Sequence, residues 1–137
     1  MDIRKFLFGG DTRQLMYKSL DATALRSRVI AENLANVETP GYQRKEVNFE
    51  DQLQNALKMK LAAQQTQPGH LPSGKGLDLA KVQAFVYEPK DATLPGEINN
   101  VDVDMEGSKM AENQILYTYL TKWVGFEKYN NAITGRA

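Results

Sequence analysis

Apolar side chains recur at helical spacing near both ends of the chain and lose that spacing in the middle. From Asp11 to Asn36 neither glycine nor proline interrupts the pattern, which predicts one long helix, capped by Asp11 or Thr12 and about 39 Å long. Its apolar residues form two groups on roughly opposite sides. The larger group is Met16, Leu20, Ala24, Ile30, Ala31 and Leu34, and the smaller is Ala22, Leu25 and Val29. Two apolar faces predict two neighbouring elements.

A second long helix is predicted over residues 101–134. Its start is rich in capping and acidic residues, which favour the positive end of a helix: Asn100, Asp102, Asp104 and Glu106. Its large apolar side chains cover an arc of about 200°. They are Met105, Ile115, Leu116, Tyr119, Leu120, Trp123, Val124, Phe126 and Ile133. One partner helix covers only part of such an arc, and a large exposed apolar surface marks an interaction site. Lys122 and Lys128 are assigned to the polar side.

The segment between the two helices has a different character. Pro40-Gly41 predicts a stop followed by a type II turn, in which the glycine supplies a positive φ. Residues 43–48 are compatible with an extended chain, and the spacing from Phe49 to Gln65 predicts a short helix. Residues 66–100 hold most of the prolines and predict irregular structure. Alternation there permits one short strand around three residues, Val82, Ala84 and Val86.

The expected fold is therefore mainly α, with two long terminal helices paired as an elongated helical hairpin or coiled coil. A shorter helix and an irregular middle segment join them in a single domain of 137 residues. The expected segments are an N-terminal arm (1–10), a helix (11–36), a turn with a short helix (37–65), an irregular loop or arm (66–100) and the C-terminal helix (101–134). Two paired helices enclose little volume, so an assembly subunit is expected.

Composition narrows the function classes further. Lys plus Arg and Asp plus Glu both number 17, so the formal net charge is zero, which disfavours a nucleic-acid-binding protein. Without cysteine, the chain has no disulfide, thiolate metal site or cysteine nucleophile. No apolar run is long enough for a cleaved signal peptide or a membrane span. Export, if it occurs, is expected without signal cleavage.

The candidate chemical sites are weak. Asp102 to Gly107 matches four positions of a calcium-binding loop, but Asn113 stands where that loop needs a glutamate, so acids at a helix start are the preferred interpretation. His70 is the only histidine and has no second histidine for a metal site. Gly74-Lys75-Gly76 lacks the rest of a phosphate-binding loop. We expect no catalytic residue, no cofactor and no metal site.

The aromatic residues of the C-terminal helix favour a packing face over a ligand cage, because they recur at helical spacing. Gly125 lies among them and costs the helix about 1 kcal/mol relative to alanine. Two interpretations of this glycine stay open at this point. It is either a tolerated imperfection or the site where a neighbouring helix approaches closely.

One stretch is much more specific. Residues 20–42, and above all Asn33-Leu34-Ala35-Asn36-Val37-Glu38-Thr39-Pro40-Gly41-Tyr42, resemble the N-terminal signature of the flagellar axial proteins, which include rod and hook subunits. Arg44 to Gln52 is similar to the family's continuation. The resemblance marks a signature and assembly set consisting of Asn33, Leu34, Ala35, Asn36, Thr39, Pro40, Gly41 and Tyr42. It covers residues 10–62 and 98–134, and Gly107 is a modest departure from the family pattern.

The short middle segment and residues 101–117 look most like a short rod protein of the proximal rod. The resemblance implies a structural subunit, not an enzyme, that assembles with copies and other rod proteins into a tubular helical shaft. It also implies export through the flagellar type III apparatus, a place in the basal-body rod across the periplasm, and contacts with the rod–ring adaptor and inner-membrane ring. Nucleic acid and direct membrane insertion are not expected. The alternative is a soluble helical adaptor or export chaperone that binds flagellar axial subunits.

Helix packing is expected to use the largest apolar residues of both long helices. The expected packing interface consists of Leu20, Leu25, Val29, Ile30, Leu116, Leu120, Trp123, Val124 and Phe126. We place the main assembly contacts on the half of the C-terminal helix nearest the chain end.

Overall fold

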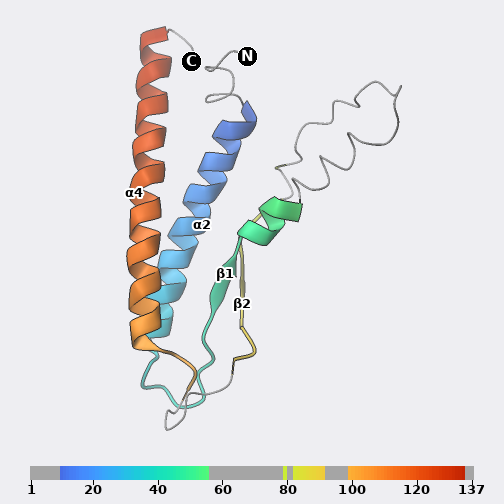
Figure 1. The fold of residues 1–137 in the computed structure, drawn as a ribbon, viewed down its shortest axis with the longest axis vertical. Coiled ribbons are helices and arrows are strands. Elements are labelled where there is room, and N and C mark those ends of the chain that lie inside the picture. Colours follow the sequence, from blue (N-terminus) through green and yellow to red (C-terminus); the bar gives the residue numbers. More distant parts are fainter. Residues whose placement is uncertain (1–9, 56–78, 80–81, 92–98, 135–137) are drawn as a thin grey trace, which may run out of the picture.

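Two long antiparallel helices dominate the computed structural model, which describes residues 10–55, 79, 82–91 and 99–134. In chain order the elements are α2 (Gly10–Ala35), β1 (Glu46–Asn48), β2 (Phe85–Tyr87) and α4 (Val103–Thr134) (Figure 1). Residues 50–55 add a short helical stretch. The predicted mainly α hairpin with a shorter helix is confirmed. His70 and Gly74-Lys75-Gly76 lie outside the described residues, as do residues 56–65 of the predicted short helix.

The α2 helix runs through the uninterrupted segment that its sequence predicted. It begins at Gly10, one residue before the expected caps, so Asp11 and Thr12 belong to its first turn. It ends at Ala35, where Asn36 N–H still donates to Glu32 O (3.2 Å) and to Asn33 O (3.1 Å). A single backbone amide shared between two carbonyls is common where a helix tightens and stops.

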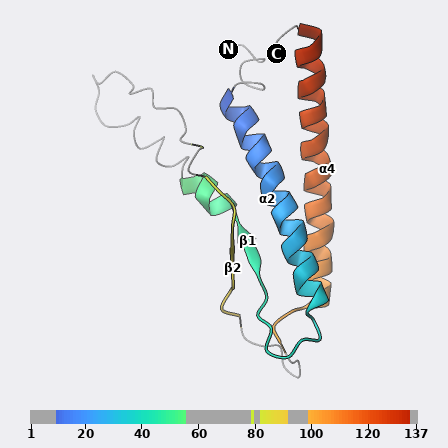
Figure 2. The same cartoon turned by 180° about the vertical axis from the view of Figure 1, so that it is seen from behind.

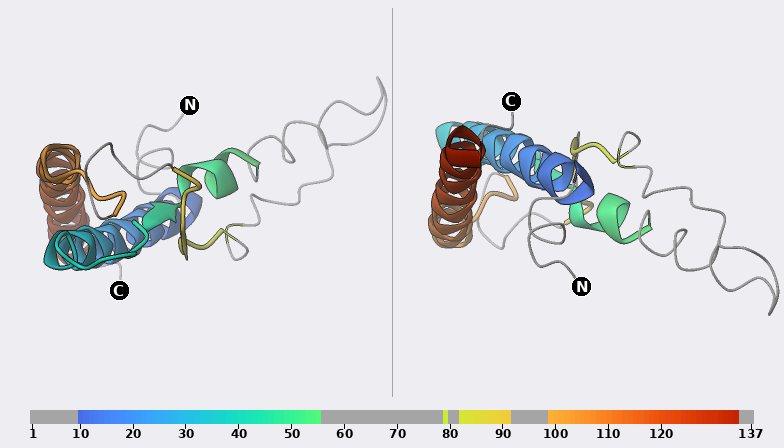
Figure 3. Two further views of the ribbon diagram at one scale, coloured as in Figure 1. Left: turned by 90° about the horizontal axis from the view of Figure 1, so that it is seen from below. Right: turned by 90° about the horizontal axis from the view of Figure 1, so that it is seen from above.

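Three layers make up the molecule, with α2 in the middle. In the side view (Figure 2) and along the long axis (Figure 3), α4 lies on one side of α2, and the two strands with the short helix lie on the other. A small apolar core fills the second interface. Its buried members are Ala22, Phe49, Leu79 and Val82, with Leu15, Leu53 and Ala84 packed against them. The prediction that α2 has two neighbours is confirmed.

The predicted grouping of apolar residues on α2 is partly wrong. Ala24 and Ala31 were grouped with Ile30, yet both alanines are exposed while Ile30 is buried. The buried arc instead includes two polar residues, Thr23 and Asn33. Because hydrogen bonds satisfy these polar side chains, they occupy interior positions that an apolar-only pattern assigns elsewhere.

The sheet is a single antiparallel pair. Val47 lies opposite Val86, and Glu46 lies opposite Tyr87, whose hydroxyl donates to Glu46 Oε2 at 2.7 Å. The extended segment before residue 49 and the short strand near Val86 were both predicted, but their pairing was not. Val47 is buried, whereas all three residues of β2 are exposed.

The α4 helix begins with an N-cap. Asp102 Oδ1 accepts from the backbone N–H groups of Asp104 (2.9 Å) and Met105 (3.0 Å), which are otherwise unpaired at a helix start. The interpretation of these acids as helix-start residues is confirmed. Neither described helix is long and apolar enough to cross a membrane.

Candidate functional site

The signature segment forms a tight turn directly after α2. Tyr42 N–H donates to Thr39 O (3.3 Å) across Pro40-Gly41, and Gly41 has a φ of 73°. This confirms the predicted type II turn with glycine in the left-handed position. Asn36 supports the turn from the helix end, because its Oδ1 accepts from Thr39 Oγ1 at 3.3 Å. The turn reverses the chain so that residues 43–48 run back along α2.

Replacing Gly41 by valine is expected to destabilise the protein by about 1–2 kcal/mol, since a β-branched residue is strained at this φ. Beyond its chain neighbours, no described residue has an atom within 4 Å of the Cβ position, so the cost is conformational and not a collision. Gly41→Asn is the matched control, because asparagine tolerates the left-handed region. Denaturant unfolding of both variants measures the difference, and equal losses would contradict the assigned geometry.

Asn33 is the most highly connected side chain of the signature. It is fully buried, at 0% exposure. Its Nδ2 donates to Lys45 O (2.8 Å) and Glu106 Oε2 (3.0 Å), while its Oδ1 accepts from Lys45 N–H (3.0 Å) and Tyr42 O–H (3.1 Å). Both donors and both acceptor positions of the amide are therefore used. Asn33, Tyr42, Lys45 and Glu106, here named the Asn33 network, connect α2, the turn, the approach to β1 and α4.

The carboxylate of Glu106 extends this network into an ionic cluster. Glu106 is 1% exposed, and its Oε1 lies 3.6 Å from both Arg44 Nη1 and Lys109 Nζ. Arg44, itself buried, also binds Glu46 at 2.6 Å and pairs with Asp91. Partners of this kind offset the cost of burying a carboxylate, and removal of one partner leaves a costly unpaired charge. The cluster therefore connects α4 to β1 and, through Arg44, to the segment that follows β2.

Glu46 gives this cluster a pH dependence. Burial by itself raises the pKa of Glu46, but hydrogen bonds from Lys109 and Tyr87, together with the charges of Lys109 and Arg44, outweigh it and lower the pKa to about 2. The usual value is 4.5. Because the folded state binds this proton more weakly than the unfolded state, Glu46 stabilises the fold above that usual value and loses its contribution as pH falls toward 2.

We therefore expect the unfolding midpoint to decrease as the pH is lowered from about 4.5 to about 2, in part through Glu46. Glu46→Gln removes the titrating group and is expected to flatten this part of the profile while lowering stability at neutral pH. Thermal unfolding at a series of pH values measures both effects. An unchanged acid profile in Glu46→Gln would show that other carboxylates carry the dependence.

Asn99, which lies shortly before α4, binds the chain segment that follows α2. Its Oδ1 accepts from Val101 N–H at 2.9 Å. Its Nδ2 lies within hydrogen-bond distance of three backbone carbonyls that follow the last turn of α2, those of Asn36 (3.1 Å), Val37 (2.6 Å) and Thr39 (3.2 Å). Backbone carbonyls outside regular structure need a partner from elsewhere, and this side chain supplies it for the segment that leaves α2. The adjacent Asn100 accepts from Arg44 N–H at 2.7 Å.

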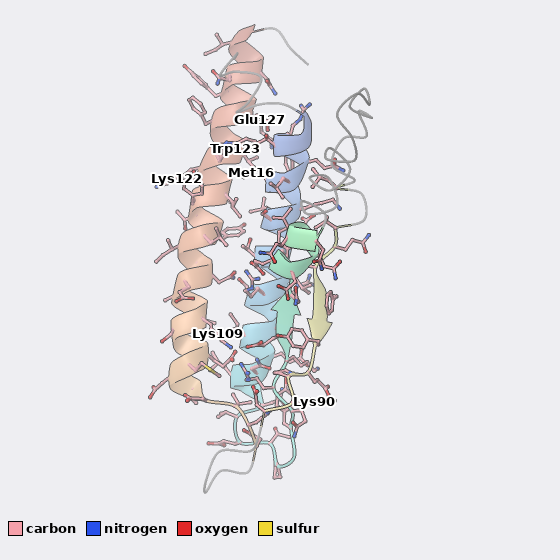
Figure 4. The ribbon with its side chains drawn as sticks, turned by 45° about the vertical axis from the view of Figure 1, so that its right-hand side comes forward. Met16, Lys90, Lys109, Lys122, Trp123 and Glu127 are labelled. Atoms are coloured by element: carbon pink, nitrogen blue, oxygen red, sulfur yellow. The ribbon has the colours of Figure 1, made fainter. Side chains whose placement is uncertain are left out.

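The face of α4 toward α2 is marked by buried residues at intervals of seven. Glu106, Asn113, Leu120 and Glu127 are all buried. Asn113 Nδ2 donates to the backbone carbonyl of Thr23 (2.9 Å) and to Ser27 Oγ (2.8 Å). Glu127 Oε1 lies 3.6 Å from Arg13 Nε, and its side chain points toward α2 in Figure 4. Buried polar residues at such positions specify register and alignment.

The large apolar side chains of α4 mostly point elsewhere. Ile115, Tyr119, Phe126, Tyr129 and Ile133 are 56–72% exposed, and Val103, Met110, Leu116 and Tyr117 are also exposed. Gly125 has no atom within 4 Å of its Cβ position, so no described neighbour in the chain approaches it closely. The wide apolar arc predicted for this helix thus faces largely outward, which is the signature of an interaction surface.

The structure divides the expected packing interface. Val29, Ile30, Leu120 and Val124 are buried, Leu20, Leu25 and Trp123 are partly buried, and Leu116 and Phe126 are exposed. Within the signature, Asn33 is buried, Leu34, Asn36 and Tyr42 are partly buried, and Ala35, Thr39, Pro40 and Gly41 are exposed. Four polar residues that organise the site were not singled out for this role: Arg44, Asn99, Glu106 and Asn113. For two of them, Glu106 and Asn113, the seven-residue spacing that runs from Glu106 to Glu127 is the sequence signal for an interior position on α4.

Comparisons with known proteins point in one direction. No protein-family model matches the chain. The chain is 31% identical over 109 residues to "Flagellar basal body rod protein FlgB" of Borreliella burgdorferi, which covers 77% of this chain and 81% of that protein. It is 30% identical over 133 residues to the protein of the same name from Bacillus subtilis, covering 94% and 97%. The corresponding protein of Escherichia coli is 29% identical over 106 residues, covering 73% and 75%.

Proposed function

The chain belongs to the FlgB family of flagellar basal body rod proteins, and from this premise we infer how its structure serves a rod. It is a structural subunit of the flagellar basal body, and it assembles with other rod components. The role is mechanical, with no catalytic step assigned to any residue. The proximal part of the rod is the proposed location.

The distribution of polar and apolar side chains on α4 carries this function. Its interior row consists largely of polar residues that bind α2, while its largest apolar residues lie on the outside. In a protein that acts alone, the apolar side chains would fill the interior and the polar ones would face water. Here internal polar contacts align the hairpin, and the outer apolar surface remains for neighbouring subunits.

The remaining steps of the proposal follow the family resemblance. The chain is exported through the flagellar type III apparatus without cleavage of a signal peptide and joins the rod across the periplasm. The rod–ring adaptor, the inner-membrane ring and other rod proteins are its proposed partners. A hairpin whose closing turn is pinned by the Asn33 network reaches its final register once the chain has left the export channel, because the network joins residues distant in sequence.

Deletion of the gene tests this function against the alternative of a soluble adaptor or export chaperone. We expect basal bodies isolated from the deletion strain to contain inner-membrane rings without a completed rod, and a plasmid copy to restore the rod. An adaptor acts before assembly and leaves no trace in the finished structure. Normal rods that lack this chain, formed at a reduced rate, would overturn the proposal in favour of the adaptor.

A further inference from the structure

The outward side of α4 carries a regular row of residues. Successive members are separated alternately by four and three positions, which keeps them on one stripe of a helix that packs in a coiled coil. The row, named the α4 outer row, consists of Ile115, Tyr119, Lys122, Phe126, Tyr129 and Ile133, all exposed. Lys122 points away from α2, whereas Lys109 and Glu127 point toward it (Figure 4). The row therefore lies apart from the face that packs within the chain.

The outward side of α2 carries a matching row. Its members alternate by three and four positions, and all are exposed although α2 is the middle layer of the molecule. This α2 outer row consists of Gln14, Tyr17, Asp21, Ala24, Arg28, Ala31 and Ala35. Three of its positions are alanines, so the surface of this row is shallow at those positions.

The two rows also complement each other in charge. Lys122 is the single charged residue of the α4 outer row, and Asp21 is the acid of the α2 outer row. Neither side chain forms a hydrogen bond or ion pair with the described residues of its own chain. Packed in opposite directions, the rows form layers that place Lys122 opposite Asp21 and Tyr119 opposite Ala24. In the same register Arg28 lies one layer from Glu112, which is also exposed.

Resting on the proposed rod function, we propose that the α4 outer row packs antiparallel against the α2 outer row of a second copy of this chain, with Lys122 opposite Asp21. Each copy then uses two different surfaces, one for each neighbour. Such a heterologous contact continues from copy to copy and does not close into an isologous dimer.

The direction of this pairing suits a polar shaft. Within one chain α2 and α4 are antiparallel (Figure 1). An antiparallel contact between α4 and the next α2 therefore makes all copies point the same way. Asn33 lies level with Glu106, which places Lys122 level with Tyr17 of its own chain. Pairing Lys122 with Asp21 shifts the next copy by four residues, about 6 Å along the helices, so successive copies climb in a helix.

Disulfide trapping tests the register, because the natural chain has no cysteine. Cells would express two tagged chains together, one with Asp21→Cys and one with Lys122→Cys, and their basal bodies would be oxidised. A covalent dimer of this chain is expected. Ala24→Cys with Tyr119→Cys traps the adjacent layer and leaves both charges in place. Lys128→Cys is the matched control, because Lys128 is exposed on α4 but lies outside the α4 outer row, and with Asp21→Cys it is expected to yield no dimer.

The outcomes separate this inference from the proposed function. Tagged wild-type chain in purified basal bodies, with no dimer from either cysteine pair, overturns the pairing but leaves the rod function standing. A cross-link to a different protein overturns the choice of a second copy. Dimers from the Lys128 control at the level of the Lys122 pair also contradict the register. Absence of the wild-type chain from basal bodies overturns both the function and the pairing that rests on it.

Discussion

Substitution of Asn33 by leucine is expected to destabilise the isolated protein by about 3–5 kcal/mol. Leucine has a similar size but cannot replace the four hydrogen bonds that Asn33 makes at 2.8–3.1 Å. The change leaves the backbone groups of Lys45 unpaired and removes the neutral donor to Glu106, a carboxylate that is 1% exposed. Since total stabilities are about 5–15 kcal/mol, such a loss removes a large share of the folded population.

Asn36 offers a matched control within the same signature. It is also an asparagine, but its side chain makes two solvent-exposed hydrogen bonds, to Glu32 O and from Thr39 Oγ1. Asn36→Ala is expected to cost about 0.5–1 kcal/mol, the net value of an ordinary exposed hydrogen bond. Denaturant unfolding followed by circular dichroism measures both variants. Similar small losses in the two would contradict the central position given to the Asn33 network.

A pair of adjacent substitutions on α4 is expected to separate folding from assembly. Leu120 is 3% exposed against α2, whereas Tyr119 is 63% exposed. Leu120→Asp places a carboxylate in the helix interface and is expected to cost about 3–5 kcal/mol, through the lost apolar burial and the cost of the charge. Tyr119→Asp is expected to change the stability of the monomer by no more than about 0.5 kcal/mol, as for other surface positions.

The two variants are then compared in the cell. Tyr119→Asp is expected to be made and exported at normal levels but to be missing from basal bodies, because it removes an outer contact that each copy repeats. Leu120→Asp is expected to lower the amount of folded protein before assembly begins. Measuring secretion beside basal-body content distinguishes a failure of export from a failure of packing. If Tyr119→Asp unfolded the monomer while Leu120→Asp left it folded, the assignment of the α4 faces would be inverted.

The extents of the two long helices followed from sequence because their signals are local. Neither proline nor glycine interrupts α2, Asp102 is a strong N-cap for α4, and Pro40-Gly41 is compatible with few turns other than type II. These features depend on residues a few positions apart. The pairing of β1 with β2 joins three-residue strands about forty positions apart and carries no such local signal.

The orientation of α4 did not follow from sequence, for a physical reason. Apolar residues cover so wide an arc that periodicity does not select the side that faces α2. Interior positions are instead taken by Glu106, Asn113 and Glu127, which are favourable there only because α2 and the loops supply matching donors and charges. Lys122, assigned to the polar side, lies in the middle of the α4 outer row. Partners distant in sequence decide all of these positions.

Electron cryomicroscopy of basal bodies that carry this chain with a C-terminal label tests the central claim most directly. The account predicts label along the rod, inside the membrane rings, with paired helical density in the rod wall wherever the label occurs. Label confined to the cytoplasmic export apparatus, or absent from basal bodies whose rods are complete, would contradict it.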